Sequence, residues 1–157
     1  MRRCLVGIGV GVLTISCGGN LTTPTAPTAS PPPLAQIAGT WRGTFESSNY
    51  PPVTVFVNLN QTGSTVSGGW DGALGSATLA GNITGTVGAS TFAGTITFAI
   101  GQTAGCSGPF SGSASTNSTI NWSSPALTGT CNLGSGNPLA PRFVLQSCLT
   151  MNCVPSH

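Results

Sequence analysis

Charged side chains are scarce in this chain. They make up 4% of its 157 residues, and lysine is absent. Two of the four arginines stand at positions 2 and 3, and the other two, Arg42 and Arg142, are balanced by two acidic residues. Nucleic-acid binding takes most of its affinity from several Lys and Arg side chains that neutralise phosphates. The composition therefore excludes a nucleic-acid partner, while the abundant Ser, Thr, Asn and Gly suit an exported β protein.

No apolar run is long enough to cross a membrane as a helix. The stretch from Cys4 to Ser16 has 13 residues, whereas a spanning helix needs about 20. It follows the basic pair Arg2 and Arg3 and ends on a small residue. A basic start, a short apolar run and a small residue before the cleavage point are typical of a signal peptide. Residues 1–16 are therefore predicted to be removed on export.

The segment Leu13-Thr14-Ile15-Ser16-Cys17 closes this region. It resembles the lipobox of bacterial lipoproteins, in which a small residue precedes a cysteine that is acylated before cleavage, although Thr14 replaces the usual leucine. The resemblance implies a lipid anchor of fatty chains, palmitate among them, on Cys17. Two acyl chains hold a protein stably on a membrane, whereas one holds it only marginally. In bacteria with two membranes, the family's behaviour implies that Gly18, in place of an aspartate, directs the protein to the outer membrane.

After Cys17 the composition changes to Thr, Pro, Ala, Ser and Gly up to residue 36. Repeated prolines fix φ and remove amide donors, so residues 17–36 are predicted to form an extended, lipidated tether. What remains, residues 37–157, amounts to roughly 120 residues, which is enough for one modest core. We therefore expect a single folded domain.

Beyond the tether, short runs rich in Val, Ile, Thr and Phe alternate with polar or small residues. Val53, Val55, Val57 and Leu59, for example, share one face of a half-buried strand. No helical period is present. The pattern predicts eight strands, near residues 39–47, 53–61, 65–70, 77–87, 91–100, 108–115, 119–129 with a break at Pro125, and 142–147.

Compact turns at Thr62-Gly63-Ser64 and Gly88-Ala89-Ser90 predict antiparallel hairpins that follow one another along the chain. An open sheet of eight strands would leave two edges free to pair with other chains, and closure into a barrel removes both. The fold class we expect is all-β, an eight-stranded antiparallel up-and-down meander β-barrel. The alternative is a β-sandwich, whose crossovers need longer connections than most in this chain.

Gly39-Thr40-Trp41 opens the first predicted strand, and Arg142 begins the last, which would pair with the first in a closed barrel. This arrangement resembles the calycins, which include lipocalins and avidins. In that group a Gly-x-Trp places the indole across one end of the barrel, beneath an Arg or Lys of the closing strand. The resemblance implies that Arg142 covers Trp41, a contact worth about 0.5 to 2 kcal/mol. The alternative is an ordinary core tryptophan and an exposed arginine. The Asn-x-Leu-Gly-Ser stretch of the avidin biotin site has no counterpart after Trp41.

The chain has six cysteines, of which Cys4 leaves with the signal peptide and Cys17 is used by the lipid. The remaining four allow three pairings in an oxidising compartment. Cys106 and Cys131 flank a predicted hairpin whose turn near Asn117 lies about midway between them. We therefore favour a disulfide between these two cysteines.

Cys148 and Cys153 then form the second disulfide. Zinc binding is a weak alternative, because only His157, at the end of the chain, could join them as a ligand. A hydrolytic triad cannot be assembled, since no histidine lies inside the predicted fold. Glu46 and Asp71 could form a catalytic carboxylate pair, but Asp71 precedes a glycine and has the look of a turn residue. We therefore expect no enzymatic activity, no cofactor and no metal.

These observations predict a non-enzymatic, lipid-anchored protein of the cell envelope, with two possible modes of action. An eight-stranded barrel can hold one small ligand or be filled by its own side chains. An interior cavity above about 300 Å³ would favour a small apolar ligand, bound in the barrel or at its mouth by residues still unknown. A filled core would favour a structural or interaction module of the envelope, of adhesion or inhibitor type, that contacts an envelope protein.

Overall fold

A computed structural model describes residues 28–48, 50–101, 103–131, 139–149 and 153. The signal peptide, Cys17 and the first part of the tether lie outside these residues, so the predictions about them stay predictions. The chain divides into two units, Met1–Ser30 and Pro31–His157, and the second contains the folded domain. Residues 31–34, at the start of this second unit, are exposed and have no regular secondary structure.

Within the described residues the folded domain is all-β and contains nine strands. The turns that join β2 to β3, β3 to β4, β4 to β5 and β6 to β7 are short, and glycine or asparagine with positive φ occupies several, as at Gly63 (φ 59°) and Asn117 (φ 50°). A side chain with a Cβ is strained in this region, which asparagine tolerates better than most residues. The strands are β1 (Gly39–Ser47), β2 (Tyr50–Thr62), β3 (Thr65–Leu74), β4 (Ala77–Val87), β5 (Thr91–Ile100), β6 (Thr103–Ala114), β7 (Thr119–Ser123), β8 (Thr128–Gly129) and β9 (Arg142–Ser147).

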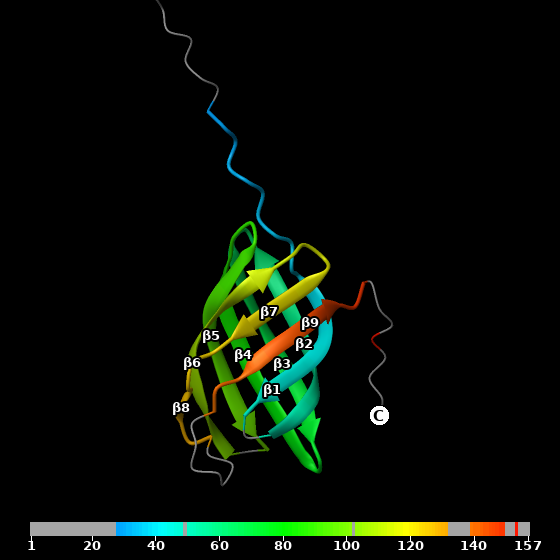
Figure 1. The fold of residues 1–157 in the computed structure, drawn as a ribbon, viewed down its shortest axis with the longest axis vertical. Coiled ribbons are helices and arrows are strands. Elements are labelled where there is room, and N and C mark those ends of the chain that lie inside the picture. Colours follow the sequence, from blue (N-terminus) through cyan, green and yellow to red (C-terminus); the bar gives the residue numbers. More distant parts are fainter. Residues whose placement is uncertain (1–27, 49, 102, 132–138, 150–152, 154–157) are drawn as a thin grey trace, which may run out of the picture. The chain divides into compact units, whose positions relative to one another are not determined.

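The sheet closes on itself (Figure 1). Strands β1 to β6 each pair antiparallel with the next strand in the sequence. Strand β9 then pairs with β7 on one side and with β1 on the other, which completes a barrel of eight strands. Strand β8 is a short addition beside β6. The predicted closed antiparallel meander is therefore confirmed, and the sandwich alternative is wrong.

The predicted strand positions agree with the structure in most places. Strands β1, β4, β5 and β9 have the predicted bounds, whereas β2 and β6 begin earlier and β3 ends later than predicted. The predicted break at Pro125 separates β7 from β8, and both of these strands lie beside β6. At the break the Ser124 hydroxyl donates a hydrogen bond to the backbone carbonyl of Pro109 on β6. This bond holds the interrupted strand against its neighbour.

Alternation along the strands separates an apolar interior from a polar exterior. Val53, Val55, Val57 and Leu59 of β2 are all buried, with exposed fractions of 4% or less, as the sequence pattern predicts. The residues between them are exposed apart from Phe56, which is half-buried. The same alternation on the other strands produces one continuous core inside the barrel.

Candidate functional site

Aromatic rings fill the interior of the barrel. Of the ten aromatic residues in the chain, eight are buried. Seven of these form one connected array whose neighbouring ring centroids lie 4.7 to 6.2 Å apart, the range in which offset and edge-to-face ring pairs attract. The array runs through Phe45, Trp70, Phe98, Phe143, Trp122, Phe92 and Phe110.

This array decides how the interior can be used. Rings from β1, β3, β5, β6, β7 and β9 meet inside the barrel, so side chains occupy the space in which a lipocalin-like barrel holds its ligand. Phe143 on the closing strand contacts Phe45 at 5.4 Å and Trp122 at 4.7 Å between ring centroids, and so links the two halves of the array. A ligand could enter here only by displacing packed rings.

The chain itself covers the end of the barrel at which β1 begins. In the segment before β1, Ala35 and Ile37 are 1% and 0% exposed. The Ala35 amide donates to Gly88 O at 2.9 Å, and the Ile37 amide donates to Gln61 Oε1 at 2.8 Å. The Asn117 amide in turn donates to Gln36 O at 3.1 Å. Residues 35–37, here called the cap, are thus bonded to three hairpins of this end, and two of them belong to the predicted tether.

Arg142 does not cover Trp41, so the contact implied by the calycin resemblance is absent from the structure. Trp41 lies opposite Ser147, whereas Arg142 lies opposite Glu46, five residues further along β1. Five residues of a strand span roughly 16 Å, which no side-chain contact bridges. The Trp41 indole is buried and donates to Ile37 O at 2.9 Å. The cap therefore takes the place at Trp41 that the resemblance assigns to an arginine.

Arg142 instead forms an ion pair with Glu46, with Nη1 and Oε2 3.1 Å apart. Both side chains are largely exposed, so the pair contributes little stability. Glu46 and Asp71 lie two strands and several residues apart, which corresponds to roughly 15 Å at ordinary strand spacings. Carboxylates that cleave a glycosidic bond together lie within about 9.5 Å of each other. These two residues are therefore not arranged as such a pair.

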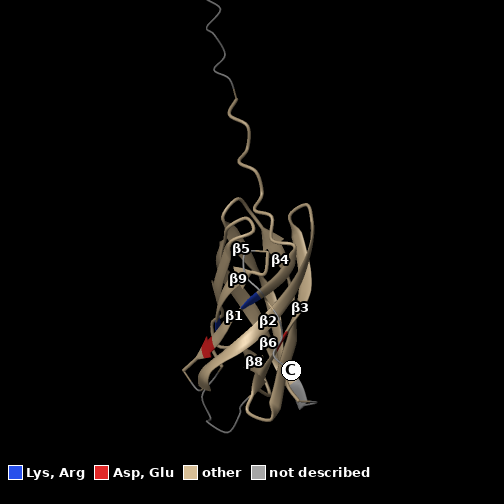
Figure 2. Cartoon of the chain, turned by 90° about the vertical axis from the view of Figure 1, so that its right-hand side faces the viewer, with Lys and Arg blue, Asp and Glu red and all other residues tan. Residues whose placement is uncertain are grey.

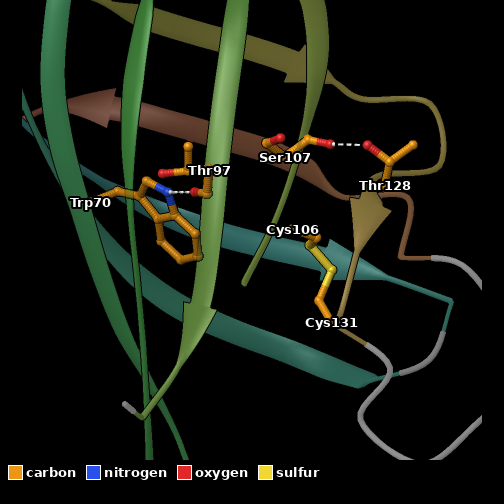
Figure 3. The surroundings of a disulfide bond; sticks show 6 residues. All are labelled: Trp70, Thr97, Cys106, Ser107, Thr128 and Cys131. Carbon is orange, nitrogen blue, oxygen red and sulfur yellow. Dashed lines mark hydrogen bonds between the residues drawn. A yellow bond between two sulfur atoms is a disulfide. The ribbon is translucent and has the colours of Figure 1, made fainter. Parts of the chain in front are cut away.

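Both favoured disulfides are present. Cys106 pairs with Cys131 and Cys148 with Cys153, each with Cα atoms 5.3 Å apart. The first bond ties β6 to the chain just after β8, next to the hydrogen bond from Thr128 Oγ1 to Ser107 O (Figure 3). Among the described residues, no three His, Cys, Asp or Glu side chains gather as a metal site would require, and His157 lies outside these residues.

The pairing between β4 and β5 is locally irregular. Their backbone pairing is interrupted at Gly81 and Asn82. Opposite this gap, the Thr97 carbonyl accepts a hydrogen bond from Trp70 Nε1 at 3.1 Å, as Figure 3 shows. The Asn82 amide donates its hydrogen bond to the Thr97 hydroxyl oxygen at 2.8 Å. A Cβ on Gly81 would collide with both the Thr97 carbonyl oxygen and Trp70 Nε1, so the arrangement requires glycine there.

A hollow of about 520 Å³, largely open to solvent, lies beside this irregularity. Among the described residues, its lining supplies backbone groups, two hydroxyls and one amide, but no acid, base or cation. These groups can form hydrogen bonds with a neutral partner. Its lining residues are Ala80, Gly81, Asn82, Thr97, Phe98, Ala99, Gly105, Cys106 and Ser107.

The charged residues of the folded domain all lie on one side of the barrel. No Asp, Glu, Lys or Arg occurs between Asp71 on β3 and Arg142 on β9, so β4 to β8 are uncharged. In Figure 2 nearly the whole ribbon is accordingly drawn in the colour of uncharged residues. The four charges are visible in the sequence, but their shared location follows only from the order of the strands in the sheet.

Three outward-facing residues of this side form a row across neighbouring strands. Arg42 on β1 lies opposite Phe56 on β2, and Phe56 lies opposite Asp71 on β3. The guanidinium carbon of Arg42 is 5.8 Å from the centroid of the Phe56 ring, a cation–π distance. We call this row the charged strip. A shallow hollow of about 320 Å³ lies beside it, lined by Arg42, Gly43, Thr44, Thr54, Val144 and Gln146.

Comparisons of the chain with protein-family models, with curated proteins and with solved structures gave no match. In the part of the chain that the structure describes, no helix has the length and apolar character needed to cross a membrane.

Proposed function

We propose that this protein is a bacterial lipoprotein of the cell envelope that acts as a non-enzymatic interaction module. Its mature form begins at Cys17, carries lipid there, and presents a solid barrel on a Thr- and Pro-rich tether. The observation that carries the choice of an interaction module is the connected array of buried rings inside the barrel. A protein whose interior is packed in this way can contact partners only with its outer surface.

The alternative, a carrier of a small apolar ligand, has less support. Ligand pockets in proteins commonly have volumes of about 300 to 1,000 Å³ and are largely apolar. The hollow of about 520 Å³ beside Gly81 falls in this range, but it is a broadly open depression in the barrel wall and not an enclosed interior cavity. A depression of this kind would leave much of an acyl chain exposed to water, whereas ligand pockets bury most of their ligand's surface.

The anchor is supported by the order of features at the amino terminus. A basic pair, a short apolar run, Ser16 and Cys17 follow one another as in lipobox signal peptides. Gly18 favours the outer membrane as the destination. The cap fits an anchor at the amino terminus, because it attaches the last residues of the tether to one end of the barrel. The side walls and the other end of the barrel then remain available to partners.

Metabolic labelling with radioactive palmitate, followed by membrane fractionation, tests the anchor. We expect wild type to carry label and to sediment with membranes, and Cys17→Ser to lose the label and enter the soluble fraction. Cys4→Ser is the matched control, because it also removes an amino-terminal cysteine yet leaves the predicted acylation site intact. Membrane retention and labelling of Cys17→Ser equal to those of wild type would refute the anchor.

Native mass spectrometry of protein extracted under mild conditions tests the mode of action. A filled barrel should show only the mass of the polypeptide and its covalent lipid. A stoichiometric additional small molecule, released on unfolding, would favour the carrier and overturn the interaction module.

A further inference from the structure

Two features distinguish the charged strip from the rest of this surface. Arg42 and Asp71 have no ion-pair partner among the described residues, in contrast to Arg142 and Glu46. Phe56 between them is half-buried, and it and Tyr50, both on β2, are the only aromatic residues that are not fully buried. Arginine and aromatic residues are enriched in the parts of protein interfaces that contribute most to binding.

The order of the strip along the sheet is cation, ring, anion. Arg42 and Asp71 each stand one strand away from Phe56, at about 4.8 Å per strand, on opposite sides of it. Consider a two-fold axis that lies in the plane of an interface and runs parallel to β2. Rotation about this axis places the β1 side of one copy over the β3 side of the other. A second copy related by this axis would set its own Asp71 against Arg42, its Arg42 against Asp71, and ring against ring. The strip is therefore complementary to itself, as an isologous interface requires.

From this pattern we propose that the outer face of β1, β2 and β3 binds a second copy of this chain, with the charged strips of the two copies in contact. The strip has no net charge, so a partner that is strongly acidic or basic would satisfy only one of its two ends. A second copy satisfies both ends at once. Self-association goes beyond the proposed function, and the contact itself does not depend on the anchor.

The direction of the axis also fits attachment to a single membrane. Rotation about an axis along β2 keeps both barrels pointing the same way, so the cap ends, from which the tethers leave, lie side by side. The other two-fold axis in the interface, perpendicular to the strands, would reverse one barrel and set Arg42 against Arg42 and Asp71 against Asp71. Like charges across an interface are unfavourable. The charge pattern thus selects the parallel pair, and two lipid-anchored copies could form it on one bilayer.

Cysteine cross-linking in the full-length, membrane-bound protein tests this geometry. Thr54 is exposed and lies on β2 two residues from Phe56, close to the proposed axis. Thr54→Cys should give a disulfide-linked dimer on non-reducing gels after mild oxidation. Thr84→Cys, at an exposed position on the uncharged β4, is the matched control and should give little dimer. Equal cross-linking at both positions would indicate random collision and overturn the proposal.

Charge reversal in the Thr54→Cys background then tests complementarity. Arg42→Asp alone, or Asp71→Arg alone, gives both ends of the strip the same charge, and we expect the dimer fraction to fall about tenfold. The double variant R42D/D71R restores opposite ends and should recover the wild-type fraction, and so should co-expression of the two single variants. Failure of both to recover, with unchanged melting temperatures, would refute the two-fold arrangement. Repeating the measurement in detergent extracts and with Cys17→Ser distinguishes this proposal from the anchor. If the two copies associate through the charged strip, the dimer fraction should depend on the charges in both cases.

Discussion

Gln61 provides the most direct test of the cap. Its side chain makes three hydrogen bonds: Oε1 accepts from the Ile37 amide at 2.8 Å, and Nε2 donates to Ala35 O and Gly63 O, both at 3.0 Å. A neutral hydrogen bond contributes about 1 kcal/mol, and leaving a buried partner unsatisfied adds to the loss. Because Gln61 is half-buried and water can replace part of these bonds, we expect Gln61→Ala to cost about 2 kcal/mol in unfolding free energy. This corresponds to about 8 °C in Tm for a domain of this size.

Thermal and urea unfolding, followed by tryptophan fluorescence, would measure this loss, and hydrogen exchange would locate it. The Ala35 and Ile37 amides should lose protection in Gln61→Ala, whether the cap detaches alone or with the whole domain. Gln146→Ala is the matched control, because it removes the same atoms from an exposed glutamine on β9. If Gln61→Ala had the same melting temperature as Gln146→Ala and the Ile37 amide stayed protected from exchange, the Gln61 side chain would not be what holds the cap.

Two further perturbations test other parts of the structure. Replacing both Cys106 and Cys131 by serine should lower the unfolding free energy by about 3.5 kcal/mol, and replacing both Cys148 and Cys153 should lower it by about 2 kcal/mol. The first loss is larger because the Cys106–Cys131 bond closes the longer loop. Urea titrations that rank the two losses in the opposite order would contradict this expectation. Gly81→Ala should cost about 2 kcal/mol or more, since its methyl group would meet the Thr97 carbonyl and the Trp70 indole nitrogen. Gly69→Ala, whose Cβ would come no nearer than 3.6 Å to any atom outside its chain neighbours, should change stability by less than about 0.5 kcal/mol. Equal stability of the two alanine variants would show that the wall at Gly81 can relax.

Much of the fold could be predicted because its signals are local. Alternation in residues 53–59 shows which face of β2 is buried without reference to any other strand. Gly63 and Asn117 mark turns because the backbone there requires positive φ. Barrel closure followed from the number of strands and from the cost of exposed edges. The Cys106–Cys131 disulfide followed from the symmetry of these two cysteines about the turn at Asn117.

The prediction about Arg142 was wrong for a different reason, and the place of residues 35 and 36 at the end of the barrel was missed for a similar one. The Trp41–Arg142 contact depended on the register between the first and last strands, and a shift of a few residues separates the two side chains. Residues 35 and 36 have the composition of the tether, but their backbone groups find partners on three hairpins distant in the sequence. No local pattern reports such partners.

By itself, the sequence determined the all-β class and the order of the strands, and it favoured both disulfides. Each of these depends on residues close together or on a simple count. The sequence also predicts the lipid anchor at Cys17. Only the tertiary structure decided that rings from six strands fill the interior, that the cap covers one end, and that Arg42, Phe56 and Asp71 form a row. These features arise where strands meet side by side. Contacts of that kind depend on register and on side-chain volume summed across the whole barrel, and neither quantity is written in any one segment.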